Sequence, residues 1–504
     1  MFSVMVSCVK VSLILGVAGW LLTGLLREPD RSWIRQRALW IMPAIYTGAM
    51  FAPSIWAIFG FAFLVVPLAA KRREDVAPFL PFAMLGIPAM SQEIRVGGSA
   101  LLTVTSWHCV FVGALLALSV HRRSGPALRI GAGAAVPFVL LYIVTIITMI
   151  HGANATTSLR SLIETFMLYG IPFLIAAQGL QTRADIRRFA TAFMIAIALQ
   201  AVIGLYQSRA YWPIYENIFW STGIPLPKAL AFKVRGGMMR ATGSYLESNS
   251  LAGLCAFGLI LVLAIRNVFR STIAFQIAVL VMLGGIYATV SRGGFVFAGL
   301  AWLGFEAYRG KYARVGIAVV GMAVLYGAAT IGGRYIAGLA AFTGGSEDSQ
   351  GTGEYRRQLF DRGIEEIMRS PVFGYDWATI KVVMGDLRQG EGIIDFVNGY
   401  ILAGITGGVG AMLMLFMMFV IAAVQVFRVR NRLPDETTAR IAAACFGVQV
   451  ATVVTCFTSG FFGNAAVPFV MLLGVGAVLT SKSIQRGARP AAFTPIRAEP
   501  LPAA

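Results

Sequence analysis

The sequence is poor in charged residues, which make up only 13% of its 504 positions. Soluble domains carry about 25% charged residues, so this chain lacks the polar surface that would keep it in water. Hydrophobic residues account for 57% of the chain, and the mean hydropathy is +0.74. A soluble enzyme is therefore excluded, and apolar runs of about 18 or more residues recur as candidate membrane helices.

Residues suited to metal, redox or nucleotide chemistry are scarce as well. The three histidines are widely separated and have no cysteine or carboxylate at convincing ligand spacing. The five cysteines lie in apolar segments without a CxxC pair, which is typical of small core residues. No GxxxxGK[ST] motif occurs, so direct use of ATP is improbable. We therefore expect neither a metal nor a cofactor.

The net charge of +19 comes from short basic loops between apolar runs. Room for a helical hairpin lies between successive clusters, so every cluster can face the cytoplasm, as the positive-inside rule predicts. This pattern explains the charge without nucleic acid. The basic clusters are Arg27–Arg37, Lys71–Arg73, Arg122–Arg129, Arg183–Arg188, Arg266–Arg270, Arg309–Arg314, Arg428–Arg432 and Lys482–Arg489. The segments predicted on the outer side are 151–161, 207–249, 333–393 and the turn at Gly460.

The sequence predicts an all-α fold, a polytopic integral membrane helix bundle of roughly 12 to 15 spans with a large periplasmic loop that carries amphipathic helices. The stretch between Arg37 and Lys71 is too short for two full spans and predicts a hairpin of short helices. The predicted divisions are N-terminal helices 1–180, a membrane core 181–332, the large loop 333–393, C-terminal helices 394–481 and a disordered cytoplasmic tail 482–504.

The first outer segment ends in a basic, glycine-rich stretch. Arg240 is followed by Ala241–Thr242–Gly243, and Asn249 lies where the next apolar helix starts. An arginine offers a planar fork of donors suited to phosphate oxygens, and a helix N-terminus adds backbone N–H groups. A diphosphate headgroup would find both here. The alternative is that Arg240 merely meets lipid phosphates or a nearby carboxylate.

A second outer arginine, Arg292, lies in the tight turn Ser291–Arg292–Gly293–Gly294 between two apolar runs. A charge at membrane depth is expensive and usually faces a polar cavity or a partner. The alternative is an arginine that snorkels to the interface. Two separate outer arginines beside glycine-rich turns favour a function.

The large loop contains an amphipathic helix over Glu354–Ser370 that carries Arg356 and Arg357 and stops at Pro371. Its predicted apolar face consists of Tyr355, Leu359, Ile364, Ile367 and Met368.

Two carboxylates, Glu391 and Asp395, close the loop before Asn398–Gly399–Tyr400 opens the next apolar run. Each carboxylate is a candidate for proton transfer or for orienting a substrate hydroxyl. The alternative for each is helix capping and complementation of the helix dipole.

Taken in this order, the motifs described above resemble those of the O-antigen ligase and O-antigen or exopolysaccharide polymerase superfamily of bacterial envelope enzymes. The resemblance covers roughly Gln178–Leu479. It rests on four stretches that occur in this order and topology. They are Arg240–Asn249, Ser291–Gly294, Arg356 or Arg357 followed by Pro371–Val372–Phe373–Gly374, and Asn398–Leu402.

The resemblance implies a metal-independent, inverting glycosyltransferase at the periplasmic face of the bacterial inner membrane. Its donor would be an undecaprenyl diphosphate-linked glycan, and its acceptor a growing glycan or lipid A core. Membrane lipids and other polysaccharide assembly proteins would be its partners. The implied diphosphate and glycan ligands are Arg240, Arg292, Arg356, Arg357 and Tyr400, with Asn398 beside the acceptor.

The sequence departs from this family at one position. The ligases carry His-Asn where this chain has Val397–Asn398, and no histidine follows His151. Asp395 or Glu391 is therefore the candidate base, and a polymerase is favoured over a ligase. A transporter of lipid-linked oligosaccharide is the alternative from another class, although the internal repeats expected of one are not evident. A non-catalytic assembly protein comes last.

Overall fold

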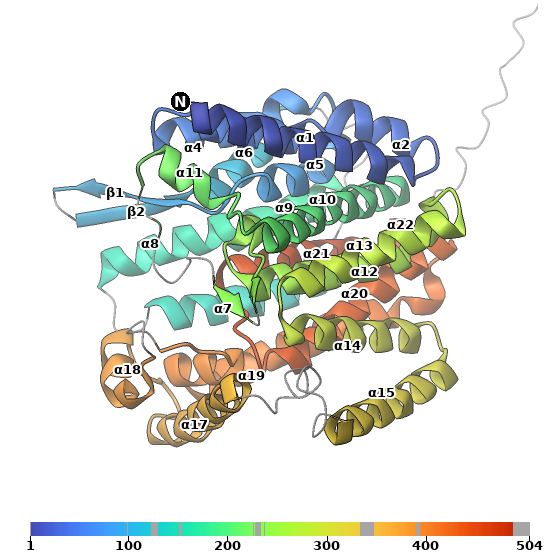
Figure 1. The fold of residues 1–504 in the computed structure, drawn as a ribbon. Helices are drawn as coiled ribbons and strands as arrows, with labels where there is room; N and C mark the ends of the chain where they lie inside the picture. Colours follow the sequence, from blue (N-terminus) through green and yellow to red (C-terminus); the bar gives the residue numbers. More distant parts are fainter. Residues whose placement is uncertain are drawn as a thin grey trace, which may run out of the picture.

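The protein is a bundle of long helices whose axes run side by side (Figure 1). The computed structural model describes residues 2–97, 99–121, 130–150, 154–224, 226, 233–235, 237–332, 347–389 and 394–486. Within these residues, six helical segments are long and apolar enough to cross a membrane, and six shorter apolar helices accompany them. The predicted all-α, multi-pass membrane fold is confirmed.

Apart from α1, the N-terminal helices are short. The helices α3 and α4 form the hairpin of short helices expected between Arg37 and Lys71. A π-helical turn, Ile34–Ala38, follows α2 directly. A second π-helical turn, Phe166–Gly170, joins α8 to α9. The bounds are α1 Phe2–Gly24, α2 Asp30–Trp33, α3 Ile41–Phe51, α4 Ile55–Ala69, α5 Arg73–Leu85, α6 Ser106–Val120, α7 Val136–Ile150, α8 Ala155–Thr165 and α9 Ile171–Gly179.

The remaining helices build the centre of the bundle and one large loop. They are α10 Arg183–Ala210, α11 Glu216–Ser221, α12 Ser248–Ala264, α13 Thr272–Ala288, α14 Arg292–Tyr308, α15 Tyr312–Gly332, α17 Glu347–Arg369, α18 Trp377–Val383, α19 Gly399–Arg428, α20 Glu436–Thr455, α21 Val467–Leu479 and α22 Lys482–Arg486. The first residues of the predicted tail thus form α22, and residues 487–504 lie outside the described residues.

Two antiparallel hairpins add a little β-structure. The strands β1 (Ser91–Val96) and β2 (Ser99–Thr105) pair with Ser91 opposite Thr105, and project from the bundle beside α8 (Figure 1). The strands β3 (Val234–Arg235) and β4 (Met238–Met239) form a much shorter pair just before Arg240.

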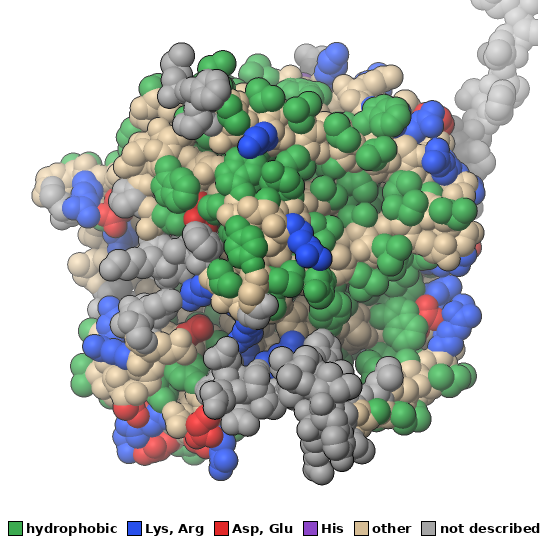
Figure 2. All heavy atoms as spheres, viewed as in Figure 1, with side chains coloured by type: hydrophobic (Ala, Val, Ile, Leu, Met, Phe, Trp, Pro, Cys, Tyr) green, Lys and Arg blue, Asp and Glu red, His purple; other side chains and the backbone are tan. Residues whose placement is uncertain are grey.

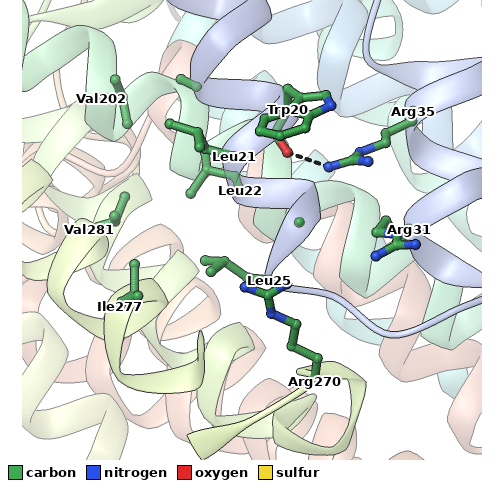
Figure 3. A pocket seen from close by; sticks show the side chains of 12 residues that line it. Trp20, Leu21, Leu22, Leu25, Arg31, Arg35, Val202, Arg270, Ile277 and Val281 are labelled. Atoms are coloured by element: carbon green, nitrogen blue, oxygen red, sulfur yellow. Dashed lines mark hydrogen bonds between the residues drawn. The ribbon is translucent and has the colours of Figure 1, made fainter. Parts of the chain in front are cut away.

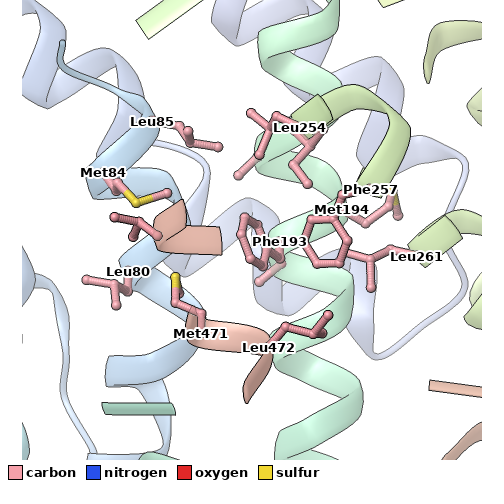
Figure 4. Close-up of a cluster of buried hydrophobic side chains, with 14 of the residues drawn as sticks. Leu80, Met84, Leu85, Phe193, Met194, Leu254, Phe257, Leu261, Met471 and Leu472 are labelled. Atoms are coloured by element: carbon pink, nitrogen blue, oxygen red, sulfur yellow. The ribbon is translucent and has the colours of Figure 1, made fainter. Parts of the chain in front are cut away.

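The centre of the bundle is packed from α5, α10, α12 and α21. Their apolar side chains, such as Leu80, Phe193, Phe257 and Met471, interlock there (Figure 4). Helices in a membrane associate through close packing rather than through the hydrophobic effect. The pair α14 and α20 illustrates this, since a Cβ at Gly304 would lie 2.8 Å from the Cα of Gly447. Glycine therefore lets these two backbones touch.

The predicted cytoplasmic clusters that lie within the described residues gather at one end of the bundle, here called the basic end, whereas Arg122–Arg129 lies outside those residues. The N–H of Arg27 donates to the carbonyl of Val268 at 2.8 Å. Four ion pairs also connect loops that are far apart in sequence. These pairs are Arg37–Asp75 at 3.2 Å, Arg187–Asp30 at 3.3 Å, Arg183–Asp435 at 3.3 Å and Arg188–Glu74 at 3.6 Å. In the view of Figure 2, charged side chains collect at the right-hand edge and the lower left, with a largely hydrophobic surface between.

At the opposite end, called the loop end, α17 and α18 pack on the first turns of α19. A separate apolar cluster holds them there, comprising Leu359, Ile367, Ile380, Met384, Leu387, Ile401 and Ile405. The prediction for α17 is partly wrong, because Ile364 and Met368 are 37% and 67% exposed.

The helix α19 is broken at Gly408, whose φ of 72° and ψ of −176° are not helical. The loop segment Pro371–Tyr375 fills the break. The N–H of Tyr375 donates to the carbonyl of Ile405 at 2.7 Å, and the N–H of Val409 donates to that of Pro371 at 2.8 Å. These bonds satisfy backbone groups that the break would otherwise leave without partners.

Candidate active site

The segment that carries Arg240 is anchored on α10 by two buried glutamines. The Oε1 of Gln207 accepts hydrogen bonds from the N–H groups of Thr242 and Gly243 at 3.3 and 3.0 Å. The Oε1 of Gln200 accepts one from the N–H of Ser244 at 3.2 Å. Since each glutamine satisfies backbone groups of an irregular segment within the bundle, the segment is fixed relative to α10.

Arg240 joins the start of α12 to the turn that precedes α14. Its Nε donates to the carbonyl of Thr289 at 3.1 Å, and its Nη2 donates to Oδ1 of Asn249 at 3.1 Å. The hydroxyl of Ser291 donates to the same Oδ1 at 3.0 Å. Two of the sequence-predicted stretches, more than 40 residues apart, are therefore hydrogen-bonded to each other.

The turn from Thr289 to Ser291 sets the position of Arg292, the first residue of α14. Val290 has a φ of 50°, a left-handed conformation that a β-branched residue rarely adopts. Such a residue stores about 1–3 kcal/mol of strain and persists only where its surroundings enforce it. Here the Arg240 hydrogen bond to Thr289 is part of that enforcement.

Arg356, on α17, reaches the same place from the large loop. Partial burial lowers the pKa of its guanidinium, and the positive charges of Arg292 and Arg235 lower that pKa further. Burial also lowers the pKa of Arg240, and Arg235 again adds to the effect. The positive charges of Arg292 and Arg235 thus act on Arg356, and that of Arg235 also acts on Arg240. These four arginines are called the arginine cluster below.

Carboxylates also act on two members of this cluster. Asp395 lies beside Arg356, and Glu247 lies beside Arg240. Glu247 also caps α12, accepting from the N–H groups of Asn249 and Ser250 at 2.9 and 2.6 Å. Guanidinium groups gathered in this way suit a doubly charged anion, whose oxygens accept from paired N–H donors.

Asp395 is exposed and its backbone is held by Tyr355 of α17. The Tyr355 hydroxyl donates to the carbonyl of Asp395 at 3.1 Å and accepts from its N–H at 3.0 Å. The structure therefore places this carboxylate beside Arg356. The other predicted carboxylate, Glu391, lies outside the described residues.

Asn398 is the N-cap of α19, a role that the sequence offered only as the alternative for the two carboxylates. Its Oδ1 accepts from the N–H groups of Tyr400 and Ile401, both at 3.0 Å. Tyr400 is only 3% exposed, and its hydroxyl donates to the carbonyl of Val453 at 3.0 Å. These contacts give both residues a structural role, and their contact with a glycan stays a prediction.

The structure separates Arg356 from Arg357, which sequence had left as alternatives. The Arg357 side chain is 78% exposed and forms an ion pair with Asp361 at 3.8 Å, one turn along α17. Adjacent residues of a helix point about 100° apart, so only one of the two arginines can face the cluster. That residue is Arg356.

Sequence reasoning had not assigned a role to three contributors to this site. Arg235 is one member of the arginine cluster, and Gln200 and Gln207 anchor the Arg240 segment. The glutamines carry a usable signal, because two polar side chains seven residues apart on the long apolar helix α10 fall on one face. In the described part of the chain, no group of three or more His, Cys, Asp or Glu residues could hold a metal ion.

One region of the chain matches a known protein family. Residues 277–416 match the family model described as O-Antigen ligase, which confirms the resemblance over about a quarter of the chain. The match includes Arg292, Arg356 and Asn398, whereas Arg240 lies before it. No curated protein matches the chain.

Proposed function

We propose, from the O-antigen ligase match over residues 277–416, that this membrane protein polymerises undecaprenyl diphosphate-linked glycan units in surface polysaccharide synthesis. The family match supports a ligase or glycosyltransferase-like activity on lipid-linked glycans. The finer proposal is a polymerase at the periplasmic face of the bacterial inner membrane. It is supported by the position of the arginine cluster, which lies at the end of the bundle opposite the basic loops.

The observation that carries the proposal is the convergence of Arg240, Arg292 and Arg356 from three separate segments. A diphosphate that bridges a lipid and a sugar carries two negative charges. The guanidinium groups of the cluster can bind the oxygens of such a diphosphate through paired N–H donors. Guanidinium groups held in advance stabilise a leaving diphosphate without rearrangement at the moment of reaction.

In the proposed reaction, a hydroxyl of the acceptor glycan attacks the anomeric carbon of the donor from the side opposite the diphosphate. The new glycosidic C–O bond forms as the bond between the anomeric carbon and the phosphate oxygen breaks, which inverts the configuration. The hydroxyl proton passes to a base, and the lipid diphosphate leaves with the bonding electron pair. The arginine cluster holds this leaving group.

Asp395 is the proposed base, or at least the acceptor that orients the hydroxyl. It is supported by its position beside Arg356 and by its exposure at the loop end. Glu391 remains the second candidate. The absence of a histidine after His151 favours a polymerase over transfer to lipid A core, because the related ligases carry His-Asn at the position of Val397–Asn398.

The test compares two neighbouring arginines in a strain that lacks the gene. The strain is complemented with wild type, Arg356→Ala or Arg357→Ala, and Arg240→Ala, Arg292→Ala and Asp395→Ala complete the set. Lipopolysaccharide and secreted polymer are resolved by chain length, and the membrane level of each variant is measured. Arg357→Ala is the matched control, because it removes the same charge from the next position of α17.

We expect wild type and Arg357→Ala to restore long chains, whereas the cluster variants leave single repeat units. Full-length lipid-linked polymer that never reaches the core would instead identify a ligase. Normal polymer from Arg240→Ala and Arg292→Ala would contradict the enzyme and return attention to a transporter or an assembly protein. Normal polymer from Asp395→Ala would remove that residue as the base.

A further inference from the structure

A cavity of about 570 Å³ lies at the basic end, between α1, α10 and α13. The three arginines Arg31, Arg35 and Arg270 lie on one side of it (Figure 3). The other side is formed by Val202, Val281 and Ile277, which come from α10 and α13. The cavity therefore combines a polar, positively charged end with an apolar body.

The cavity opens on the lateral surface of the bundle. Its outer lining residues Trp20, Leu21 and Ile277 are 60%, 56% and 41% exposed. Its inner lining residues Leu22 and Leu25 are only 6% and 8% exposed. In a protein that spans the membrane, an apolar lateral surface of this kind faces lipid. A molecule that enters this cavity therefore comes from the bilayer.

Two of the three arginines have no carboxylate partner within the described residues. Arg31 forms an ion pair with Glu28 at 2.7 Å. Arg35 is held by neutral groups, with its Nε donating to Oγ1 of Thr23 at 2.8 Å and its Nη2 to the carbonyl of Trp20 at 2.7 Å. Arg270 is exposed, and its backbone N–H donates to the carbonyl of Leu25 at 2.9 Å. Arg35 and Arg270 thus contribute two positive charges at the cavity end.

The depth of the cavity matches one leaflet. Val281 lies about 14 Å along α13 from Thr272, the first residue of the helix after Arg270, at about 1.5 Å per residue. The hydrocarbon core of a bilayer is about 30 Å thick. The cavity thus reaches from the basic end to about the middle of the membrane, as the acyl chains of one phospholipid do.

We propose that this cavity binds an anionic phospholipid of the leaflet at the basic end. Its phosphate lies between Arg35 and Arg270, and an acyl chain lies along Val202, Ile277 and Val281. Guanidinium groups bind phosphate oxygens through paired donors. A zwitterionic lipid brings its own ammonium group, which reduces the gain from the two arginines. The site lies at the opposite end from the arginine cluster and does not depend on the proposed reaction.

The test titrates purified full-length protein in detergent with phosphatidylglycerol or phosphatidylcholine and reads the bound lipid by native mass spectrometry. The variants are Arg270→Gln alone and Arg35→Gln/Arg270→Gln. The matched control is Arg428→Gln/Arg432→Gln, which removes two exposed arginines from the basic end, away from the cavity, and neither has an ion pair within the described residues. Thermal unfolding shows whether each variant is folded.

We expect wild type to bind phosphatidylglycerol more tightly than phosphatidylcholine. The double variant should lose about thirtyfold in phosphatidylglycerol affinity, since each arginine near an anionic surface contributes about fivefold. Arg270→Gln alone, at an exposed position, should lose about fivefold. Equal losses in the control variant, or equal affinity of wild type for both lipids, would overturn the proposal.

A second variant tests the apolar part of the cavity without changing its charge. Val281→Trp fills the space beside α13 and should weaken the binding of both lipids. Unchanged phosphatidylglycerol binding in this variant would show that the lipid lies elsewhere. If Val281→Trp instead dissolved a wild-type dimer and left lipid binding intact, the cavity would be an interface between two copies of the chain.

Discussion

Gly374→Ala should detach the large loop from the broken helix α19. Gly374 has a φ of 68°, and a Cβ there would meet the carbonyl oxygen of Ile405 and the backbone of Thr406. An alanine in a left-handed conformation costs about 1–2 kcal/mol. The overlap with backbone atoms cannot be relieved by a rotamer change, so the segment Pro371–Tyr375 must move out of the break.

The magnitude follows from the contacts that this movement breaks. Two backbone hydrogen bonds cross the joint, Tyr375 to Ile405 at 2.7 Å and Val409 to Pro371 at 2.8 Å. Each contributes about 1 kcal/mol net. A displaced segment forms neither bond, so the docked state should lose about 2 kcal/mol, which raises the undocked population by about thirtyfold.

Hydrogen–deuterium exchange measures this opening directly, because amide protection reports the free energy of local unfolding. Peptides that contain Tyr375 and Val409 should exchange about thirtyfold faster in Gly374→Ala. Gly353→Ala is the matched control, since a Cβ at this position of α17 meets no atom within 4 Å. Unchanged exchange in Gly374→Ala, or equal acceleration in both variants, would refute the reasoning.

Two further predictions concern the loop end. Asn398→Ala should lower stability by about 1 kcal/mol because it removes the α19 cap. Asn398→Asp should keep the melting temperature, because aspartate also caps helices, but should lose polymer formation if the side-chain amide donates to the acceptor. Wild-type activity of Asn398→Asp would limit this residue to capping. Arg240→Lys should lose activity as the pH rises. A lysine has an ordinary pKa of about 10.4. Burial and the positive charge of Arg235, which lower the pKa of Arg240, would also lower the pKa of the lysine and favour its neutral amine. Wild type should stay flat over the same range, since arginine keeps its charge, and parallel pH profiles of in vitro polymer formation would count against this explanation.

The sequence was sufficient to predict the partition of charge between the two ends of the bundle. Basic loops separated by hairpin lengths of apolar sequence can all lie on one side, and ion pairs such as Arg187–Asp30 now join them. The three arginines of the loop end were predicted for the same reason, since each follows or precedes an apolar run that must end on the other side. The alternation of sides along the chain therefore allows the side of each loop to be predicted from its own charge and from the apolar runs beside it.

Two other features were missed, although one had a local signal. The hairpin β1–β2 has Gly97 and Gly98 between stretches that contain Ile94, Val96 and Val104, a pattern typical of a tight β-turn between strands. The choice between Arg356 and Arg357 had no such signal. It depends on which face of α17 packs on α19, and the predicted apolar face included Ile364 and Met368, which the structure leaves exposed.

The break in α19 shows why part of the site could not be predicted from the sequence. Residues 399–428 are a single apolar run, and a pair such as Gly407–Gly408 is compatible with a continuous membrane helix. A broken helix within a membrane requires partners for its freed backbone groups. Those partners come from Pro371 and Tyr375, more than 25 residues earlier in the chain. The same joint fixes the end of α17, and therefore the distance from Arg356 to Arg292. The position of Arg356 in the arginine cluster thus depends on the apolar packing of α17 on α19 together with two backbone hydrogen bonds that no local pattern encodes.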